Sequence, residues 1–441
     1  MENITALQAG FGKVNVTPDF SVGLDGHSNY ESRRSEGVTA PIFVTCVAVK
    51  SGDETILIYT IDNLAFNNAK AEDLRGLLAE ATGISGEKVF VGATHCHSCP
   101  ALAMSDPPGK KYYDEVLLPG AVEAAKTALA DLAPAALYTG RTELQGMNFI
   151  RHYVTANGTI AGSNFGTFKD NPAVGYDRET DPRMLLVKFA REGDKKSILM
   201  VNWQAHPDYN TGIGEYNISA DFPGALRDKL SQDTGMLVAY FTGASGDENP
   251  KSRVAADNHN LETFKDYGEK LAEIAYNALP DLKPSADTTI KTLRVMYDAQ
   301  INHTQDHMLE QAKEIYRVWK AEGNAEGNAK AREYGLTTRY EARGIINRYN
   351  MPKILPLELN AFRIGDIGFM TGTMEMFSTT GIYARAHSPF ENTFIITGCS
   401  GYIPCERAFS YMSYEAVSTF YIKGTAEKLG VQYAEMLHQV K

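Results

Sequence analysis

The sequence has few cysteines, no basic clusters and no long apolar run. Five cysteines among 441 residues are too few for the disulfide framework of a secreted protein, so we expect reduced thiols. No run of Lys and Arg offsets the net charge of -11, which argues against a nucleic-acid or anionic-membrane partner. Residues 1–10 show no basic leader or apolar core, and no segment is long enough to cross a bilayer. We therefore expect a cytoplasmic protein with no stable membrane association.

The chain does contain enough apolar residues, 43%, to bury a large core. Short β-branched runs end in polar or Gly-containing loops, and amphipathic helical patterns lie between them. This alternation predicts an α/β fold, a layered sandwich with a mixed β-sheet and an active site at the strand ends. The expected strands are Thr55–Ile61, Val89–Ala93, Ile198–Trp203, Leu237–Phe241, Ile367–Thr371 and Phe394–Thr397, with further strands around Cys46, 136–139 and 186–190. The expected helices are Asp114–Leu132, Glu262–Leu279 and Ala416–Val440.

Two segments differ from this pattern. His303–Arg348 is charged and helical and contains the doubled sequence A-E-G-N-A-E-G-N-A at Ala321–Ala329, which predicts an inserted helical pair joined by a turn rather than a regulatory lid. Asn148–Arg183 is rich in Gly, Asn and Tyr, and we expect it to be a long loop that faces substrate.

The segment Lys88–Pro100, K-V-F-V-G-A-T-H-C-H-S-C-P, ends an apolar run in two histidines and two cysteines. In an extended strand alternate side chains share a face, so His95 and His97 would project together. His206 and Glu375 follow two other expected strands. Zinc prefers nitrogen, sulfur or carboxylate ligands, and a catalytic zinc site keeps one position for water. These four side chains are therefore candidates for a metal centre.

Two other motifs offer alternatives. Cys96 and Cys99 form a C-x-x-C, the spacing that thiol–disulfide oxidoreductases use, although Pro100 follows and the chain is far larger than a thioredoxin unit. Thr242–Pro250 is a Gly-rich turn after a strand, but it matches neither a phosphate-binding loop nor the G-x-S-x-G elbow that would make Ser245 a nucleophile.

Several of these segments together resemble the neutral (alkaline, non-lysosomal) ceramidase family of zinc-dependent amidases, in the family's order from Gly10 to Val440. The family's T-H-T-H-S-G-P is similar to T-H-C-H-S-C-P, and its N-W-F-x-x-H is similar to N-W-Q-A-H. The other similar segments are Gly10–Thr17, Leu24–His27, Asn148–Arg151, Thr373–Thr379, Gly401–Pro404 and Tyr414–Ala416.

The resemblance implies a role for each matching residue. The implied zinc ligands are His95, His206, Glu375 and Tyr402, with water activated by the metal as the attacking group. His97 is then the general acid that protonates the leaving amine, and Glu375 relays the proton of the water. Tyr414 and Arg151 stabilise the oxyanion or anchor the substrate.

The sequence also departs from the family. Cys96 and Cys99 replace a Thr and a Gly, and nothing corresponds to the family's C-terminal immunoglobulin-like domain, so we expect one catalytic domain over residues 1–441. The acidic chain shows no apolar surface for approaching a membrane, and we therefore expect a small N-acyl substrate rather than ceramide. An ester or lactone substrate at the same site remains an alternative, as does the C-x-x-C redox function.

Overall fold

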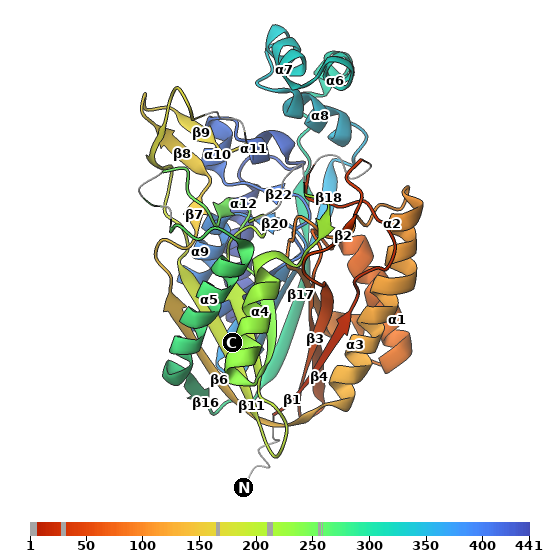
Figure 1. The fold of residues 1–441 in the computed structure, drawn as a ribbon, viewed down its shortest axis with the longest axis vertical. Helices are drawn as coiled ribbons and strands as arrows, with labels where there is room; N and C mark the ends of the chain where they lie inside the picture. Colours follow the sequence, from red (N-terminus) through yellow and green to blue (C-terminus); the bar gives the residue numbers. More distant parts are fainter. Residues whose placement is uncertain (1–6, 28–31, 165–167, 210–214, 255–256, 258) are drawn as a thin grey trace.

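The computed structural model describes residues 7–27, 32–164, 168–209, 215–254, 257 and 259–441. Two β-sheets pack face to face between outer helices, and a small group of helices stands at the upper end in Figure 1. This is the layered α/β sandwich with mixed sheets that the sequence predicts.

The larger sheet of the described chain has nine strands in the order β14-β12-β11-β6-β1-β3-β4-β5, with β16 beside β6. Its strands are β1 (Gln8–Asn15), β3 (Phe43–Ser51), β4 (Glu54–Ile61), β5 (Val89–Ala93), β6 (Ala133–Glu143), β11 (Arg183–Arg191), β12 (Ile198–Trp203), β14 (Leu237–Thr242) and β16 (Lys283–Ser285). The strands around Cys46, 136–139 and 186–190 are therefore present as β3, β6 and β11. Most neighbours are antiparallel, but β4–β5 and β12–β14 are parallel.

The smaller sheet has the order β17-β18-β19-β21 and packs on the larger one. Its strands are β17 (Ile290–Gln300), β18 (Ile354–Ile364), β19 (Ile367–Gly372) and β21 (Asn392–Thr397), and β19–β21 is again a parallel pair. Phe90 of the larger sheet stacks on Phe362 with ring centroids 4.0 Å apart, and Phe362 stacks on Phe369 at 4.5 Å. Such aromatic contacts bury large apolar areas, which explains why the interior between the sheets is rich in Phe.

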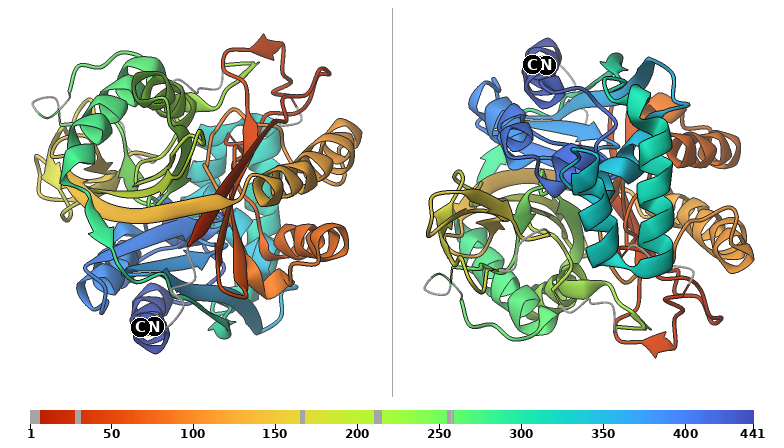
Figure 2. Two further views of the ribbon diagram at one scale, coloured as in Figure 1. Left: turned by 90° about the horizontal axis from the view of Figure 1, so that it is seen from below. Right: turned by 90° about the horizontal axis from the view of Figure 1, so that it is seen from above.

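Helices cover the outer face of each sheet, as the views in Figure 2 show. The helices α1 (Asn68–Thr82) and α3 (Leu118–Ala130) cover the β1–β5 part, α4 (Asp221–Thr234) and α5 (Phe264–Ala278) cover β11, β12 and β14, and α9 (Ser378–Ala386) and α12 (Thr425–Val440) cover the smaller sheet. Gly10 and Gly12 let α3 approach β1 closely, because an added Cβ would lie 2.0 Å from the carbonyl oxygens of Ala128 and Ala124.

One expected helix is wrong in extent. Ala416–Val440 is not continuous: a short helix α11 (Tyr414–Ser418) ends before Thr419, and α12 begins after Gly424. Gly424 has a φ of 87°, a left-handed conformation that interrupts a helix and that glycine adopts without steric cost.

The segment 303–348 contains three helices rather than a pair: α6 (Leu309–Glu322), α7 (Asn324–Glu333) and α8 (Arg339–Arg348). The doubled sequence does not form a simple turn, because it ends α6, passes Gly323 and continues as the start of α7. Helix α8 packs directly on α11, and a Cβ added to Gly344 would lie 2.5 Å from the carbonyl oxygen of Val417. We call this group of three helices the helical insert; it stands at the top of Figure 1.

The segment 148–183 is also more regular than expected. It contains β7 (Phe149–Ile150), β8 (His152–Thr155), β9 (Ile160–Gly162) and β10 (Ala173–Tyr176), of which β10-β8-β9 form a small antiparallel sheet. The expectation of an irregular loop was wrong for these strands. The remaining short strands are β2 (Gly37–Val38), β13 (Asn217–Ile218), β15 (Glu248–Asn249), β20 (Glu375–Met376) and β22 (Tyr402–Ile403), and the remaining α-helices are α2 (Pro107–Tyr112) and α10 (Glu406–Ser410). Among the described helices, none combines the length and apolarity required to span a bilayer.

Candidate metal centre and active site

Three parallel strand pairs, β4–β5, β12–β14 and β19–β21, place their carboxyl ends at one edge of the sandwich. Side-chain hydrogen bonds hold these ends together. The hydroxyl of Thr242 donates to the carbonyl of Thr94 at 2.8 Å, and the hydroxyl of Thr397 donates to the carbonyl of Thr242 at 3.2 Å. Ligands of α/β sheets bind at the carboxyl ends of strands, so the loops that follow form the candidate site.

His95 is positioned by the loop after β5. The strand ends at Ala93, and His95 has a φ of 66°, so the segment is not extended through the histidines as expected, although the two imidazoles do project together. A left-handed conformation is uncommon for a non-glycine residue and is held here by surrounding contacts, including a hydrogen bond from the His95 amide to the carbonyl of Asn63 at 2.9 Å. The turn nevertheless brings His97 Nε2 within 3.3 Å of His95 Nε2.

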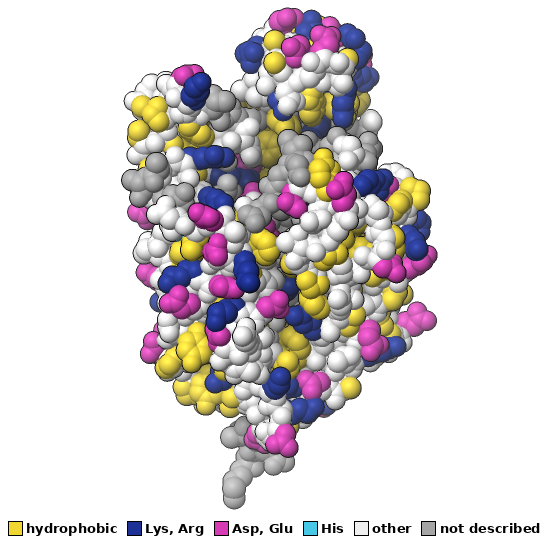
Figure 3. All heavy atoms as spheres, in the orientation of Figure 1, with side chains coloured by type: hydrophobic (Ala, Val, Ile, Leu, Met, Phe, Trp, Pro, Cys, Tyr) yellow, Lys and Arg dark blue, Asp and Glu magenta, His cyan; other side chains and the backbone are white. Residues whose placement is uncertain are grey.

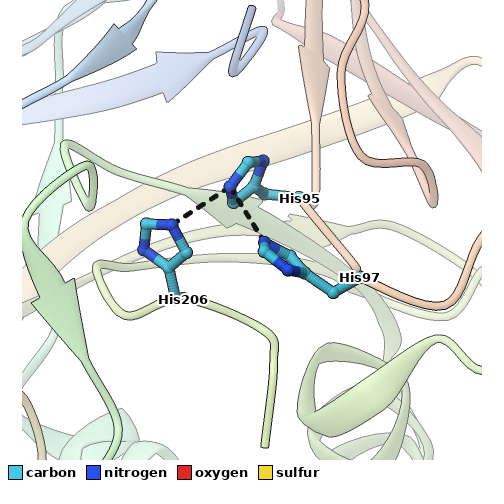
Figure 4. Close-up of side chains that lie close together, drawn as sticks. All are labelled: His95, His97 and His206. Atoms are coloured by element: carbon cyan, nitrogen blue, oxygen red, sulfur yellow. Dashed lines mark hydrogen bonds between the residues drawn. The ribbon is translucent and has the colours of Figure 1, made fainter. Parts of the chain in front are cut away.

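His206 follows β12 and faces His95, with 3.2 Å between their Nε2 atoms (Figure 4). Both rings are fixed by backbone carbonyls at their other nitrogen: His95 Nδ1 donates to Leu64 at 2.7 Å, and His206 Nδ1 donates to Ser245 at 2.8 Å. Carbonyl oxygens only accept, so in each neutral ring the Nε2 lone pair points into the cluster. Histidines that bind metals in proteins are usually oriented in this way.

Glu375 adds a carboxylate from the smaller sheet. It lies in β20, which pairs with β22 so that Glu375 is opposite Tyr402. Its Oε1 lies 3.0 Å from His206 Nε2 and 3.4 Å from His95 Nε2, and it accepts no hydrogen bond within the described chain. Burial alone would raise the pKa of Glu375, but the neighbouring His95 and His206 outweigh burial and lower it to about 2. The carboxylate is therefore ionised at neutral pH.

The donor atoms of His95, His206 and Glu375 fit a small divalent cation. A tetrahedral zinc site with bonds of about 2.05 Å has ligand atoms about 3.3 Å apart. The observed separations are 3.2 Å between the two Nε2 atoms, 3.0 Å from His206 Nε2 to Glu375 Oε1 and 3.4 Å from His95 Nε2 to Glu375 Oε1. If both rings are neutral, these donors repel each other. Burial alone would lower the pKa of His95, but the Glu375 carboxylate outweighs burial and raises it, so either a proton on His95 or a cation among the donors relieves the repulsion.

His97 is the third histidine of the cluster, and its nitrogen donors lie within 4.8 Å of those of His95 and His206. The loop that carries it is held by Arg33, which donates to the His97 carbonyl at 2.8 Å. Gly26 passes so close that an added Cβ would lie 2.5 Å from His97 Cα. Burial, and then the charges of His95 and His206, lower the pKa of His97 well below its usual value. Unlike His206, it lines the cavity described below.

Arg151 contacts the cluster from the other side. Its Nη1 lies 3.1 Å from His206 Nε2, and its Nε donates to Glu415 Oε1 at 2.7 Å. The second oxygen of Glu415 is 2.8 Å from His152 Nε2. Burial alone would raise the pKa of Glu415, but Arg151 and His152 outweigh it and keep that pKa far below its usual range. Glu415 therefore fixes the guanidinium of Arg151 beside the histidines.

Tyr402 and Tyr414 form a wall above Arg151. The Arg151 guanidinium lies 5.4 Å from the centroid of the Tyr402 ring, and the Tyr402 and Tyr414 centroids are 5.8 Å apart. Burial, and then the charge of Glu375, raise the pKa of Tyr402 well above its usual value. The structure thus gathers all seven site residues expected from the sequence, His95, His97, Arg151, His206, Glu375, Tyr402 and Tyr414, around one centre.

A cavity of about 420 Å³ opens beside this centre. His97, Arg151, Tyr402 and Tyr414 line it, together with residues that lie far away in the sequence: Gly26, His27, Arg33, Asp208, Tyr216 and Tyr340. Its volume suits a small organic molecule. Tyr340 belongs to α8, so the helical insert forms part of the cavity wall.

Supporting residues were missed by sequence reasoning. Glu415 directly follows Tyr414, and that adjacency was the only signal for it. The Gly-rich turn is neither a phosphate loop nor a nucleophile elbow but a support for the site. Its Ser245 carbonyl accepts from His206, and the carbonyl of Asp247 accepts from the Arg151 amide at 2.9 Å. Gly246 packs on β20, where an added Cβ would lie 2.9 Å from the carbonyl oxygen of Met376.

The cysteines of the C-x-x-C are buried core residues. Cys96 and Cys99 are free thiols that contact the carbonyl oxygens of Ala220 and Ser219 at 3.1 and 3.7 Å. Burial, and then the neighbouring Cys96, raise the pKa of Cys99 well above its usual value. Disulfide exchange requires an accessible thiolate of low pKa, so this arrangement contradicts the redox interpretation.

Comparisons with known proteins agree with the fold. No family model matches the sequence, and no curated protein matches it either. The solved structures that are similar to this chain include two of ceramidases. Neutral ceramidase from Pseudomonas aeruginosa superimposes with a TM-score of 0.71 and 15% identity, over 98% of this chain and 74% of that one. A ceramidase complexed with C2 superimposes with a TM-score of 0.70 and 15% identity, over 98% of this chain and 75% of that one. The chain therefore has a ceramidase-like fold.

Proposed function

We propose that this protein is a zinc-dependent hydrolase that cleaves the amide bond of a small N-acyl compound. The observation that carries the proposal is the convergence of His95, His206 and Glu375 at metal-ligand distances, with Arg151 and His97 in the same cavity. The ceramidase-like fold supports an amide substrate, since ceramidases are named for hydrolysing the amide of ceramide.

In this proposal His95, His206, Glu375 and Tyr402 hold the ion. A bound zinc supplies Lewis acidity, which polarises a carbonyl and brings the pKa of a water ligand close to neutrality. Glu375, ionised in the described structure, accepts the proton that the attacking water loses.

Arg151 and Tyr414 bind the carbonyl oxygen as negative charge develops on it. Arg151 is suited to this because Glu415 locks its guanidinium in place, so little reorganisation is needed during the reaction. The proton that Glu375 takes from the water passes to His97, which delivers it to the amide nitrogen. Its ring lines the cavity and its loop is clamped by Arg33, so the donor nitrogen is held at a fixed position beside the substrate.

The choice between amide and ester rests on His97. An amine leaves poorly without a proton, whereas an alkoxide needs less help from an acid. We expect the zinc-loaded protein to hydrolyse N-acyl p-nitroanilides, and His97→Ala to lose at least about 100-fold in kcat. Hydrolysis confined to p-nitrophenyl esters and unaffected by His97→Ala would favour the esterase or lactonase alternative.

The proposed substrate is a small metabolite rather than a membrane lipid. The cavity is lined by Arg33, Arg151, Asp208 and two histidines as well as by tyrosines, so it presents polar groups along much of its wall. We also propose a cytoplasmic location, because the five free, buried cysteines suit a reducing compartment.

A further inference from the structure

A second cavity lies beside the catalytic one, beneath the helical insert. Its volume is about 380 Å³, and it separates α7 and the start of α8 from β9 and from the loop between α10 and α11. In Figure 3 the outline of the molecule is notched between the insert and the neighbouring shoulder that carries the β8–β10 sheet. Asn164 lines both cavities, so the two are neighbours.

Positive charge dominates this second cavity. Arg332 and Arg339 line it, and its described lining includes no carboxylate. Arg339 is buried, with 8% of its surface exposed, yet it forms no ion pair within the described chain. Its guanidinium lies 4.3 Å from the centroid of the Tyr340 ring and 5.0 Å from that of Trp319. A buried cation is normally paired with an anion, so an arginine held only by aromatic rings and neutral groups is unusual.

Two buried hydrogen-bond donors of residues that line this cavity are also unused within the described chain. Arg339 donates through Nη1 to Asn328 at 3.2 Å and through Nη2 to the Tyr340 hydroxyl at 3.0 Å, but its Nε has no partner in the described chain. The buried hydroxyl of Thr338 has none either. The nearest acid in sequence, Glu341, is occupied by Gln305 and by the Thr337 amide. An anion in the cavity would accept both free donors and neutralise the guanidinium.

The position of the general acid indicates which part of a substrate reaches this cavity. His97 would protonate the leaving amine, and its ring lies 5.7 Å from that of His27, on the side of the catalytic cavity that carries Asp208 and Tyr216. Another part of the wall runs from Tyr402 through Tyr414 to Tyr340, with ring centroids 5.8 and 5.1 Å apart, and reaches the insert at Tyr340. The acyl chain would therefore extend along the tyrosines towards Arg339.

We propose that Arg339 and Thr338 bind a carboxylate at the far end of the acyl chain, so that the substrates are N-acyl compounds derived from dicarboxylic acids. This inference rests on the proposed amidase function. The helical insert then selects the acyl group, and an uncharged fatty acyl chain would leave the arginine buried and unpaired.

The test uses the mono-p-nitroanilides of succinic, glutaric, adipic and suberic acids. Each is compared with the same compound whose free carboxylate has been converted to a methyl ester, which removes the terminal charge. For at least one chain length, we expect kcat/KM to favour the carboxylate by about 10- to 100-fold, mainly through KM. Arg339→Gln should abolish this preference, and Thr338→Val should reduce it several-fold. The exposed Arg317 of α6 provides a matched control, and Arg317→Gln should keep the preference.

Calorimetric titration with free dicarboxylates tests the cavity without catalysis. Binding by the wild type and by Arg317→Gln, lost in Arg339→Gln, supports the carboxylate site even if no anilide is hydrolysed, in which case the amidase proposal fails and with it the assignment of the carboxylate to an acyl group. Anilide hydrolysis without preference for the carboxylate at any length overturns the inference alone. A preference that survives both Arg339→Gln and Thr338→Val overturns it as well, and Thr338→Val decides the matter if Arg339→Gln does not fold.

Discussion

The three histidines and Glu375 offer two different sets of metal donors, and exchanging single side chains should separate them. One set is His95, His206 and Glu375, whose donor atoms are 3.0 to 3.4 Å apart. The other replaces Glu375 by His97, and its donor atoms spread over as much as 4.8 Å. A tetrahedral zinc site requires separations of about 3.3 Å, which favours the first set. We therefore expect His206→Ala and Glu375→Gln to lose zinc, and His97→Gln to keep it.

The expected loss of thermal stability follows from the zinc affinity and from the chain length. Loss of an outer partner of a ligand weakens metal binding by about 10- to 100-fold, so loss of a ligand itself should cost at least about 100-fold. Zinc present at about 100 times its Kd stabilises the folded protein by about 2.7 kcal/mol. Unfolding 441 residues carries an entropy of about 0.9 kcal/mol/K, so removing that zinc should lower Tm by about 3 °C.

The assay combines metal content with thermal unfolding. Plasma mass spectrometry should find about one zinc per chain in the wild type and in His97→Gln, and a chelator should lower Tm by the same amount in both. His206→Ala should contain little zinc and show no response to the chelator. Zinc lost from His97→Gln but retained by Glu375→Gln would refute the reasoning and identify the three histidines as the ligands.

Three further predictions concern the support of the site and the core. The five buried thiols should react with Ellman's reagent only after unfolding, so a fast reaction in native buffer would contradict their burial. Gly246→Ala brings a Cβ to 2.9 Å from a β20 carbonyl oxygen, so it should lower the free energy of unfolding by about 1–3 kcal/mol and lower Tm. Gly175→Ala has open space around the new Cβ and should leave Tm unchanged. Glu358 forms a buried bidentate pair with Arg75 at 2.6 Å; burial alone would raise the pKa of Glu358, but Arg75 outweighs it and the pKa is lowered. Its contribution to stability is therefore complete above the unfolded pKa of about 4.5 and disappears as the pH falls through the lower folded value. Glu358→Gln should destabilise the protein by about 3–5 kcal/mol at pH 7 and flatten the acid limb of its stability profile, while Glu391→Gln, in an exposed ion pair, should change stability by less than about 1 kcal/mol.

The expected strands could be read from the sequence because each is an apolar, β-branched run that ends at a polar loop. Burial decides this pattern locally, and β4, β5, β12, β14, β19 and β21 all match it. The expected helix through Gly424 and the expected loop at 148–183 failed for different reasons. Gly424 is a local signal for a helix break that the expected helix ran through, whereas the pairing of β8 with β9 and β10 depends on contacts that no short stretch of sequence encodes.

The sequence by itself determined which side chains stand after strand ends, and so which of them could bind a metal. It could not determine that Arg151 would be fixed by Glu415, because the two are 264 residues apart and meet only when β7 and α11 pack at the same edge. The tertiary structure also determined that the C-x-x-C is not a redox site, because its thiols lie in the core at the start of α4 rather than in the cavity. Local hydrophobic patterns fix the elements, whereas the geometry of a site depends on atoms brought together from distant elements, and only the packed sheets supply that.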